Sequence, residues 1–96
     1  NKLFRMFKSD DLLQLRSELN EIDDKLFTLF IKRYKLCKQI GEIKKSLNIP
    51  IYQPQIYNEK LNKIIEKAQI ENIPQEVIEK LYNIIHEICV DAQSID

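Results

Sequence analysis

The sequence predicts an all-α chain of three helices, one very long, one short and one of medium length, that associates as a homodimer. Two interruptions, in the stretches NIPIYQP and IENIP, divide it into three helical segments, and no segment has the alternating pattern of a strand. Across the first segment, apolar residues recur at alternating spacings of three and four when position 33 is counted. This apolar stripe consists of Leu12, Leu15, Leu19, Ile22, Leu26, Leu29, Leu36, Ile40, Ile43 and Leu47.

The first helix is predicted to begin at Ser9 or Asp10 and to end near Leu47. Ser9 and Asp10 suit a helix start, and Lys44 and Lys45 near the other end interact favourably with the helix dipole. At ~1.5 Å per residue this helix is more than about 50 Å long. Because one chain of 96 residues cannot cover both ends of such a rod, we expect a second copy to cover its stripe.

The second helix is predicted to begin at Pro54, a favourable first position, and to end within the stretch IENIP. Its inward-facing residues are expected to be Tyr57, Leu61, Ile64, Ile65 and Ala68. The third helix is predicted to open at Pro74. Its apolar stripe consists of Ile78, Leu81, Ile85, Ile88, Ala92 and Ile95.

The length of 96 residues fits one small domain, which we assign to residues 10–96. We assign residues 1–9 to an N-terminal extension or a cloning remnant. They lack the uninterrupted apolar core of a signal peptide, and without an initial Met the chain is expected to be trimmed or excised from a longer one. Fifteen basic and fifteen acidic residues balance, which argues against a nucleic acid or membrane partner.

The two cysteines, Cys37 and Cys89, both fall on apolar helical faces and have no metal-ligand spacing. We therefore expect them to be reduced and buried, in a cytoplasmic protein. The single histidine, His86, has no Ser or Asp partner at a telling spacing, so we expect a structural or surface role. No metal, cofactor or nucleophile motif is recognisable, which leaves cations and amides beside the apolar stripes as candidate functional groups.

Arg33 is the strongest candidate, because it stands on the stripe that the first helix should bury. A buried guanidinium is costly unless an anion meets it. That anion is either a carboxylate such as Glu21 or Asp24 of a partner helix, or a bound ligand. Lys44 lies eleven residues further on, which returns to nearly the same face about 16 Å along the axis.

Three further residues lie beside the stripes. Arg16 is seventeen residues before Arg33, about 25 Å away, so it can reach the same small ligand only from an antiparallel partner. Gln93 flanks the stripe of the third helix and is either a ligand donor or a surface amide. Gly41, which costs about 1 kcal/mol against Ala inside a helix, indicates either close helix packing or room for a ligand.

These residues, in this order, resemble the all-α chorismate mutase family, type II. The resemblance covers roughly residues 10–95 and rests on LRSELNEIDDKLFTLFIKRYKLCKQIGEIK, IPIY and IIHEICVDAQ. It implies an intertwined dimer with two active sites built across the subunits. It also implies that Arg33 and Arg16 of the other subunit bind the two carboxylates of the substrate. Lys44 and Gln93 would donate to the ether oxygen whose bond to carbon breaks.

The activity that this resemblance implies is the pericyclic rearrangement of chorismate to prephenate in aromatic amino-acid biosynthesis. Such a reaction needs a held conformer and donors to the developing charge, and no nucleophile, metal or cofactor. The chain departs from the family's Asp-x-x-Arg-Glu pattern, with Gln53, Ile56 and Tyr57 in those places. Gln53 can still hydrogen-bond, whereas Ile56 and Tyr57 cannot replace a guanidinium and a carboxylic acid. Cys89 occupies a substrate-side position where a small hydroxyl residue is common.

Two alternatives follow from these departures. Isochorismate-pyruvate lyase, or a mutase acting on aminodeoxychorismate, would keep the equivalents of Arg16, Arg33, Lys44 and Gln93 with different ring-side contacts. A helical dimerisation or regulatory module without turnover is the alternative from another class. Arg33 argues against that module, because a pure dimer would be more stable with Leu there.

Overall fold

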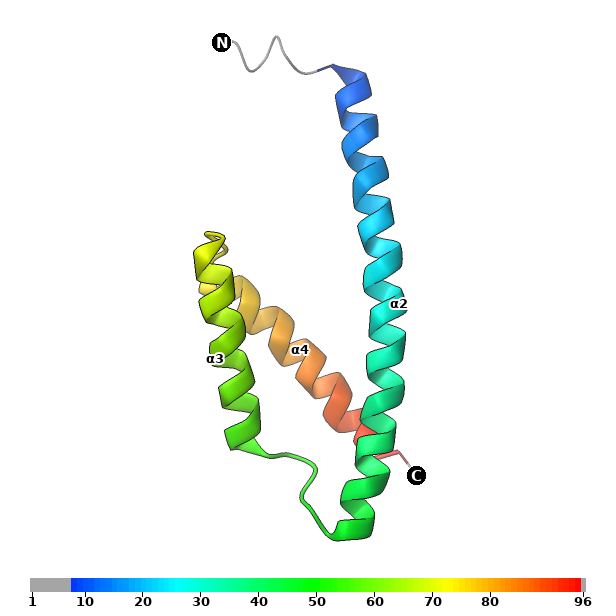
Figure 1. Ribbon diagram of the computed structural model, residues 1–96, viewed down its shortest axis with the longest axis vertical. Coiled ribbons are helices and arrows are strands. Elements are labelled where there is room, and N and C mark those ends of the chain that lie inside the picture. Colours follow the sequence, from blue (N-terminus) through cyan, green and yellow to red (C-terminus); the bar gives the residue numbers. More distant parts are fainter. Residues whose placement is uncertain (1–7, 96) are drawn as a thin grey trace. The chain divides into compact units, whose positions relative to one another are not determined.

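The computed structural model describes residues 8–95, which form three helices and no strand (Figure 1). Helix α2 spans Ser9–Leu47, α3 spans Pro54–Ile70 and α4 spans Gln75–Gln93. The predicted all-α class is confirmed, and so are the bounds predicted for the first helix. Pro74 precedes α4 as its N-cap, one residue before the helix itself. Residues 1–7 of the predicted extension, and Asp96, lie outside the described residues.

The chain divides into two compact units, residues 1–33 and residues 34–96, which are described separately here. In the first unit, all of residues 9–33 are helical, as the N-terminal part of α2. The six stripe residues from Leu12 to Leu29 are between 51% and 61% exposed in this single chain. Such a face normally packs against another apolar surface. The homodimer that would cover it remains a prediction.

An asparagine with a left-handed backbone follows shortly after each of α2 and α3. Asn48 has φ 56° and Asn72 has φ 59°, a conformation that asparagine adopts more readily than most residues. The next residue then returns a hydrogen bond to the helix. Ile49 N donates to Lys44 O at 2.8 Å, and Ile73 N donates to Ala68 O at 3.0 Å. The turns that follow the two helices therefore form at Asn48 and Asn72, inside the predicted stretches NIPIYQP and IENIP and before Pro50 and Pro74.

Helices α3 and α4 pack against each other within residues 34–96. Ala68 and Tyr82 are buried, and Tyr57 is half-buried with its ring centroid 5.4 Å from that of Tyr82. The ring of His86 lies 4.3 Å from that of Tyr57 and 5.5 Å from that of Tyr52, which comes from the preceding linker. These contacts agree with the inward orientation predicted for Tyr57 and Ala68, and with a structural role for His86.

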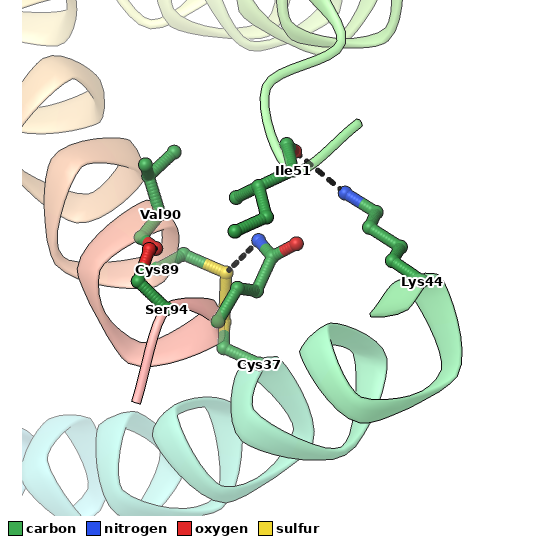
Figure 2. The surroundings of a disulfide bond; sticks show 7 residues. Cys37, Lys44, Ile51, Cys89, Val90 and Ser94 are labelled. Atoms are coloured by element: carbon green, nitrogen blue, oxygen red, sulfur yellow. Dashed lines mark hydrogen bonds between the residues drawn. A yellow bond between two sulfur atoms is a disulfide. The ribbon is translucent and has the colours of Figure 1, made fainter. Parts of the chain in front are cut away.

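The prediction of reduced cysteines is wrong, because a disulfide joins Cys37 of α2 to Cys89 of α4 (Figure 2). Burial was predicted better, since Cys37 is 4% exposed and Cys89 is half-buried. The sequence placed each cysteine on an apolar face, but periodicity cannot reveal that two faces 52 residues apart meet. Their Cα atoms are 5.4 Å apart, within the usual range for a disulfide.

Within residues 8–95, none of the three helices combines the length and apolar character that a membrane span requires.

Candidate active site

A cavity of about 380 Å³ lies within residues 34–96, where the end of α2, the following linker and the end of α4 meet. This volume is in the range of sites that hold small molecules. Among the lining residues two carry ammonium groups and none carries a carboxylate, which favours an anionic occupant. The lining residues are Gly41, Lys44, Lys45, Asn48, Ile49, Ile51, Gln93 and Ser94.

Lys44 reaches this cavity from the last turn of α2. Its side chain is half-buried, and Nζ donates a hydrogen bond to the carbonyl oxygen of Ile51 at 2.7 Å (Figure 2). Burial, together with the positive charge of Lys60, lowers the pKa of the Lys44 ammonium below its usual range. An anion in the cavity would oppose both effects. Lys44 is thus a positioned donor rather than a freely solvated surface lysine.

Gln93 reaches the same cavity as the last residue of α4. Its Nε2 donates to Sγ of Cys89 at 3.4 Å, and sulfur is a weak acceptor. Its Oε1 is buried and has no hydrogen-bond partner among residues 8–95. Oε1 needs a hydrogen-bond donor, whereas Nε2 is stabilised if a stronger acceptor replaces the sulfur. Gln93 can therefore exchange its sulfur contact for an oxygen acceptor in the cavity.

Gly41 allows α4 to approach α2 at this cavity. A Cβ atom added at Gly41 would lie 2.5 Å from both Cα and the carbonyl oxygen of Gln93. Any side chain at position 41 would therefore displace the last turn of α4. Of the two interpretations of this glycine, close helix packing is confirmed, and the backbone that it packs against is that of Gln93.

The residues expected near the ring of the substrate, Gln53 and Tyr57, and the nearby Cys89 also belong to residues 34–96. Gln53 is the N-cap of α3 without a capping side-chain hydrogen bond, and neither it nor Tyr57 is among the residues that line the cavity. The hydroxyl of Tyr57 donates to Oδ1 of Asn83. Cys89 contacts Gln93 through a sulfur that, being in a disulfide, has no hydrogen to donate. Sequence reasoning missed Cys37, Ile51 and Asn83, which bear no motif and acquire their roles only through tertiary contacts.

Arg16 and Arg33 belong to the other unit, residues 1–33, and both lie on α2. Arg16 is exposed, whereas Arg33 is half-buried although the surrounding stripe residues are exposed. The roles of these two arginines in ligand binding remain predictions. The chemistry available at the cavity is donation of hydrogen bonds to an oxygen acceptor, and Lys44 and Gln93 are the donors whose contacts hold them there.

Comparison with known proteins gives a consistent result. The family model described as chorismate mutase type II matches residues 15–94. A bifunctional chorismate mutase/prephenate dehydratase of Aquifex aeolicus is 33% identical over 87 residues, which is 88% of this chain and 24% of that protein. A chorismate mutase of Methanocaldococcus jannaschii is 30% identical over 78 residues, which is 81% of this chain and 79% of that protein.

A second bifunctional chorismate mutase/prephenate dehydratase, from Buchnera aphidicola, is 34% identical over 88 residues, 92% of this chain and 23% of that protein. The chain thus spans about a quarter of the length of the bifunctional relatives and about four fifths of the Methanocaldococcus protein. No solved structure matches the chain.

Proposed function

Because the chain belongs to the chorismate mutase type II family, we propose that it catalyses the rearrangement of chorismate to prephenate, a step of aromatic amino-acid biosynthesis. The observation that supports this most directly is the convergence of Lys44 and Gln93 on one cavity that has cationic lining and no carboxylate. The matched residues 15–94 include both donors and both arginines. The occupant would be a small dicarboxylate.

The reaction is intramolecular, so the protein contributes by holding a reactive conformer and by stabilising charge. As the ether bond breaks, its oxygen gains negative charge. We assign Nζ of Lys44 and Nε2 of Gln93 as the donors to that oxygen. Both are held in place before the substrate arrives, Lys44 by the Ile51 carbonyl and Gln93 by Cys89. Little reorganisation is then needed in the transition state.

The carboxylates of the substrate would be bound by arginines, whose planar guanidinium suits two-point recognition. We assign one carboxylate to Arg33 and the other to Arg16 of the partner subunit. The exposure of the stripe from Leu12 to Leu29 supports a homodimer in which α2 of a second copy covers this face. In the intertwined arrangement each active site then uses residues of both chains.

The second candidate function is that of a lyase acting on isochorismate, and the contacts of Tyr57 support it. The family's carboxylic acid at this position contacts the ring hydroxyl of the substrate. Here the Tyr57 ring packs on Tyr82 and His86, and its hydroxyl is engaged by Asn83. A substrate whose ring hydroxyl needs no acidic partner would therefore fit as well.

We propose that the protein acts in the cytoplasm. Disulfides in that compartment are usually transient or redox-responsive. In that compartment the disulfide between Cys37 and Cys89 would be open to reduction.

The proposed function is tested by incubating the protein separately with chorismate and with isochorismate. We expect prephenate from chorismate. Salicylate and pyruvate from isochorismate, without prephenate from chorismate, would establish the lyase instead. Absence of turnover with both substrates, in a protein shown by circular dichroism to be helical and folded, would leave a helical dimerisation module as the function.

A further inference from the structure

The disulfide is the feature of residues 34–96 that the proposed reaction does not use. It joins α2 to α4 one helical turn before Gln93 (Figure 2). Cys89 Sγ is also the acceptor for Nε2 of Gln93, at 3.4 Å. The atom that orients the proposed catalytic amide is therefore itself part of a covalent crosslink.

The disulfide and Gly41 form two consecutive contacts between the same helices. Cys37 and Gly41 are four residues apart on α2, and Cys89 and Gln93 are four residues apart on α4. Residues at this spacing lie on one face of a helix, one turn apart. Cys37 is joined to Cys89 by the S–S bond, and one turn further on Gly41 is in close contact with the backbone of Gln93. Together the two contacts fix both the separation and the register of the last turn of α4.

The last turn of a helix needs such an anchor. Its final carbonyls lack partners within the helix, and helix ends open more readily than helix centres. After Gln93, α4 continues only into the cap Ser94, whose Oγ donates back to the carbonyl of Val90 at 3.0 Å. That hydrogen bond ties the end of α4 to α4 itself. It does not hold α4 on α2.

We propose that the Cys37–Cys89 disulfide is a positioning element for Gln93, so that the rate of the reaction depends on the redox state of this pair. The inference rests on the proposed function, in which Gln93 donates to the ether oxygen. A dithiol reductant would cleave the S–S bond, each sulfur gaining one electron and one proton, while the reductant becomes a cyclic disulfide. The freed end of α4 would then lose the fixed placement of its amide.

The experiment compares the oxidised protein with the same protein treated with dithiothreitol. The chain contains two cysteines, so reduction is followed by titrating free thiols from none to two. We expect kcat for chorismate to fall about tenfold, less than the ~10²–10³-fold loss typical of removing a donor completely. KM should change less than about threefold, and reoxidation should restore kcat. The double variant Cys37→Ser, Cys89→Ser should match the reduced protein and be insensitive to dithiothreitol.

A purely structural crosslink is distinguished by repeating the comparison in Gln93→Ala. If the disulfide acts through Gln93, reduction should leave the residual kcat of this variant unchanged. An equal fold-loss in Gln93→Ala and in the unmodified protein would overturn the proposal. So would a lowered Tm on reduction with an unchanged kcat, or two free thiols in protein purified without reductant.

A second readout separates this inference from the proposed function. In a protein labelled with ¹⁵N at glutamine, reduction should shift or broaden the side-chain amide signal of Gln93, with the signal of the exposed Gln14 as control. If the oxidised protein does not turn over chorismate, the proposed function fails while the amide signal still decides the positioning role. An unchanged Gln93 signal would contradict that role whatever the activity.

Discussion

The two units of this chain differ in how much of their apolar surface the chain covers by itself. Residues 34–96 contain the buried side chains of Cys37, Ala68, Tyr82 and Ala92, and a crosslink between two helices. In residues 9–33, by contrast, every stripe residue from Leu12 to Leu29 is more than half exposed. Long helices in proteins are stabilised mainly by packing of their apolar face. Contacts within one chain hold Lys44 and Gln93, whereas the arginine roles proposed above depend on a second copy. Residues 34–96 also leave apolar surface uncovered, since Leu36, Ile43 and Leu47 are more than half exposed.

The largest effect is expected from Arg33→Leu, which completes the apolar stripe of α2. Removing a charge that the dimer would bury can be neutral or stabilising, so folding and Tm should be maintained or improved. Activity should fall by several orders of magnitude, because a substrate carboxylate loses its guanidinium.

Lys32→Leu is the control for this variant, since it adds the same side chain at an exposed neighbouring position off the stripe. It should retain activity within about threefold, as surface changes generally do. If Arg33→Leu unfolds while Lys32→Leu does not, Arg33 belongs to a structural ion pair.

Lys44→Ala tests residues 34–96 and should lower kcat about 10²–10³-fold, the usual loss for one preorganised donor. The donor acts more strongly on the transition state than on the ground state, so KM should change much less than kcat. Steady-state kinetics measures both. Lys38→Ala, an exposed lysine of the same helix, is the matched control. Near-normal turnover in Lys44→Ala would remove the catalytic assignment.

Gly41→Ala disturbs the contact between Gly41 of α2 and the backbone of Gln93 of α4, which forms within one chain. The added methyl group would lie 2.5 Å from the Gln93 backbone, so the last turn of α4 must move. Overpacking of this kind typically costs about 1–3 kcal/mol, and we expect kcat to fall about tenfold. Denaturant unfolding and kinetics measure the two effects. Unchanged kcat together with unchanged stability would show that α4 does not depend on this approach.

The smallest effect concerns pH. Burial and then the charge of Lys60 lower the pKa of Lys44, so its charged form is lost as pH rises through that lowered value. At high pH kcat/KM should decline, and the pKa of that decline, which reports the free enzyme, should lie below the usual range for lysine. The corresponding pKa in the profile of kcat should be higher than that in kcat/KM, because the carboxylates of bound substrate favour the charged form of Lys44. Lys60→Gln should move this decline of kcat/KM to higher pH, and a decline that does not move would contradict the effect of Lys60 on Lys44.

Local features were predictable from sequence, because caps, prolines and the three-four spacing act over a few residues. The bounds of α2 followed from such signals, whereas for Gly41 the sequence left close packing and room for a ligand as alternatives. The pairing of Lys44 with Gln93 came from family resemblance, since the two residues are far apart in the chain. The disulfide could not be predicted, because helical periodicity gives the face of each cysteine and says nothing about which faces meet. The same limit applies to the bond from Lys44 to the Ile51 carbonyl.

The central claim, that each active site combines Arg16 of one subunit with Lys44 of the other, is tested most directly by hybrid dimers. Arg16→Ala and Lys44→Ala should each be nearly inactive alone. After unfolding and refolding an equimolar mixture, half of the dimers would be hybrids, each with one intact site of two. The mixture should therefore recover about a quarter of the activity of the unmodified protein. Activity no greater than the mean of the two separate variants, in a mixture where mass spectrometry detects the hybrid dimer, would contradict the account.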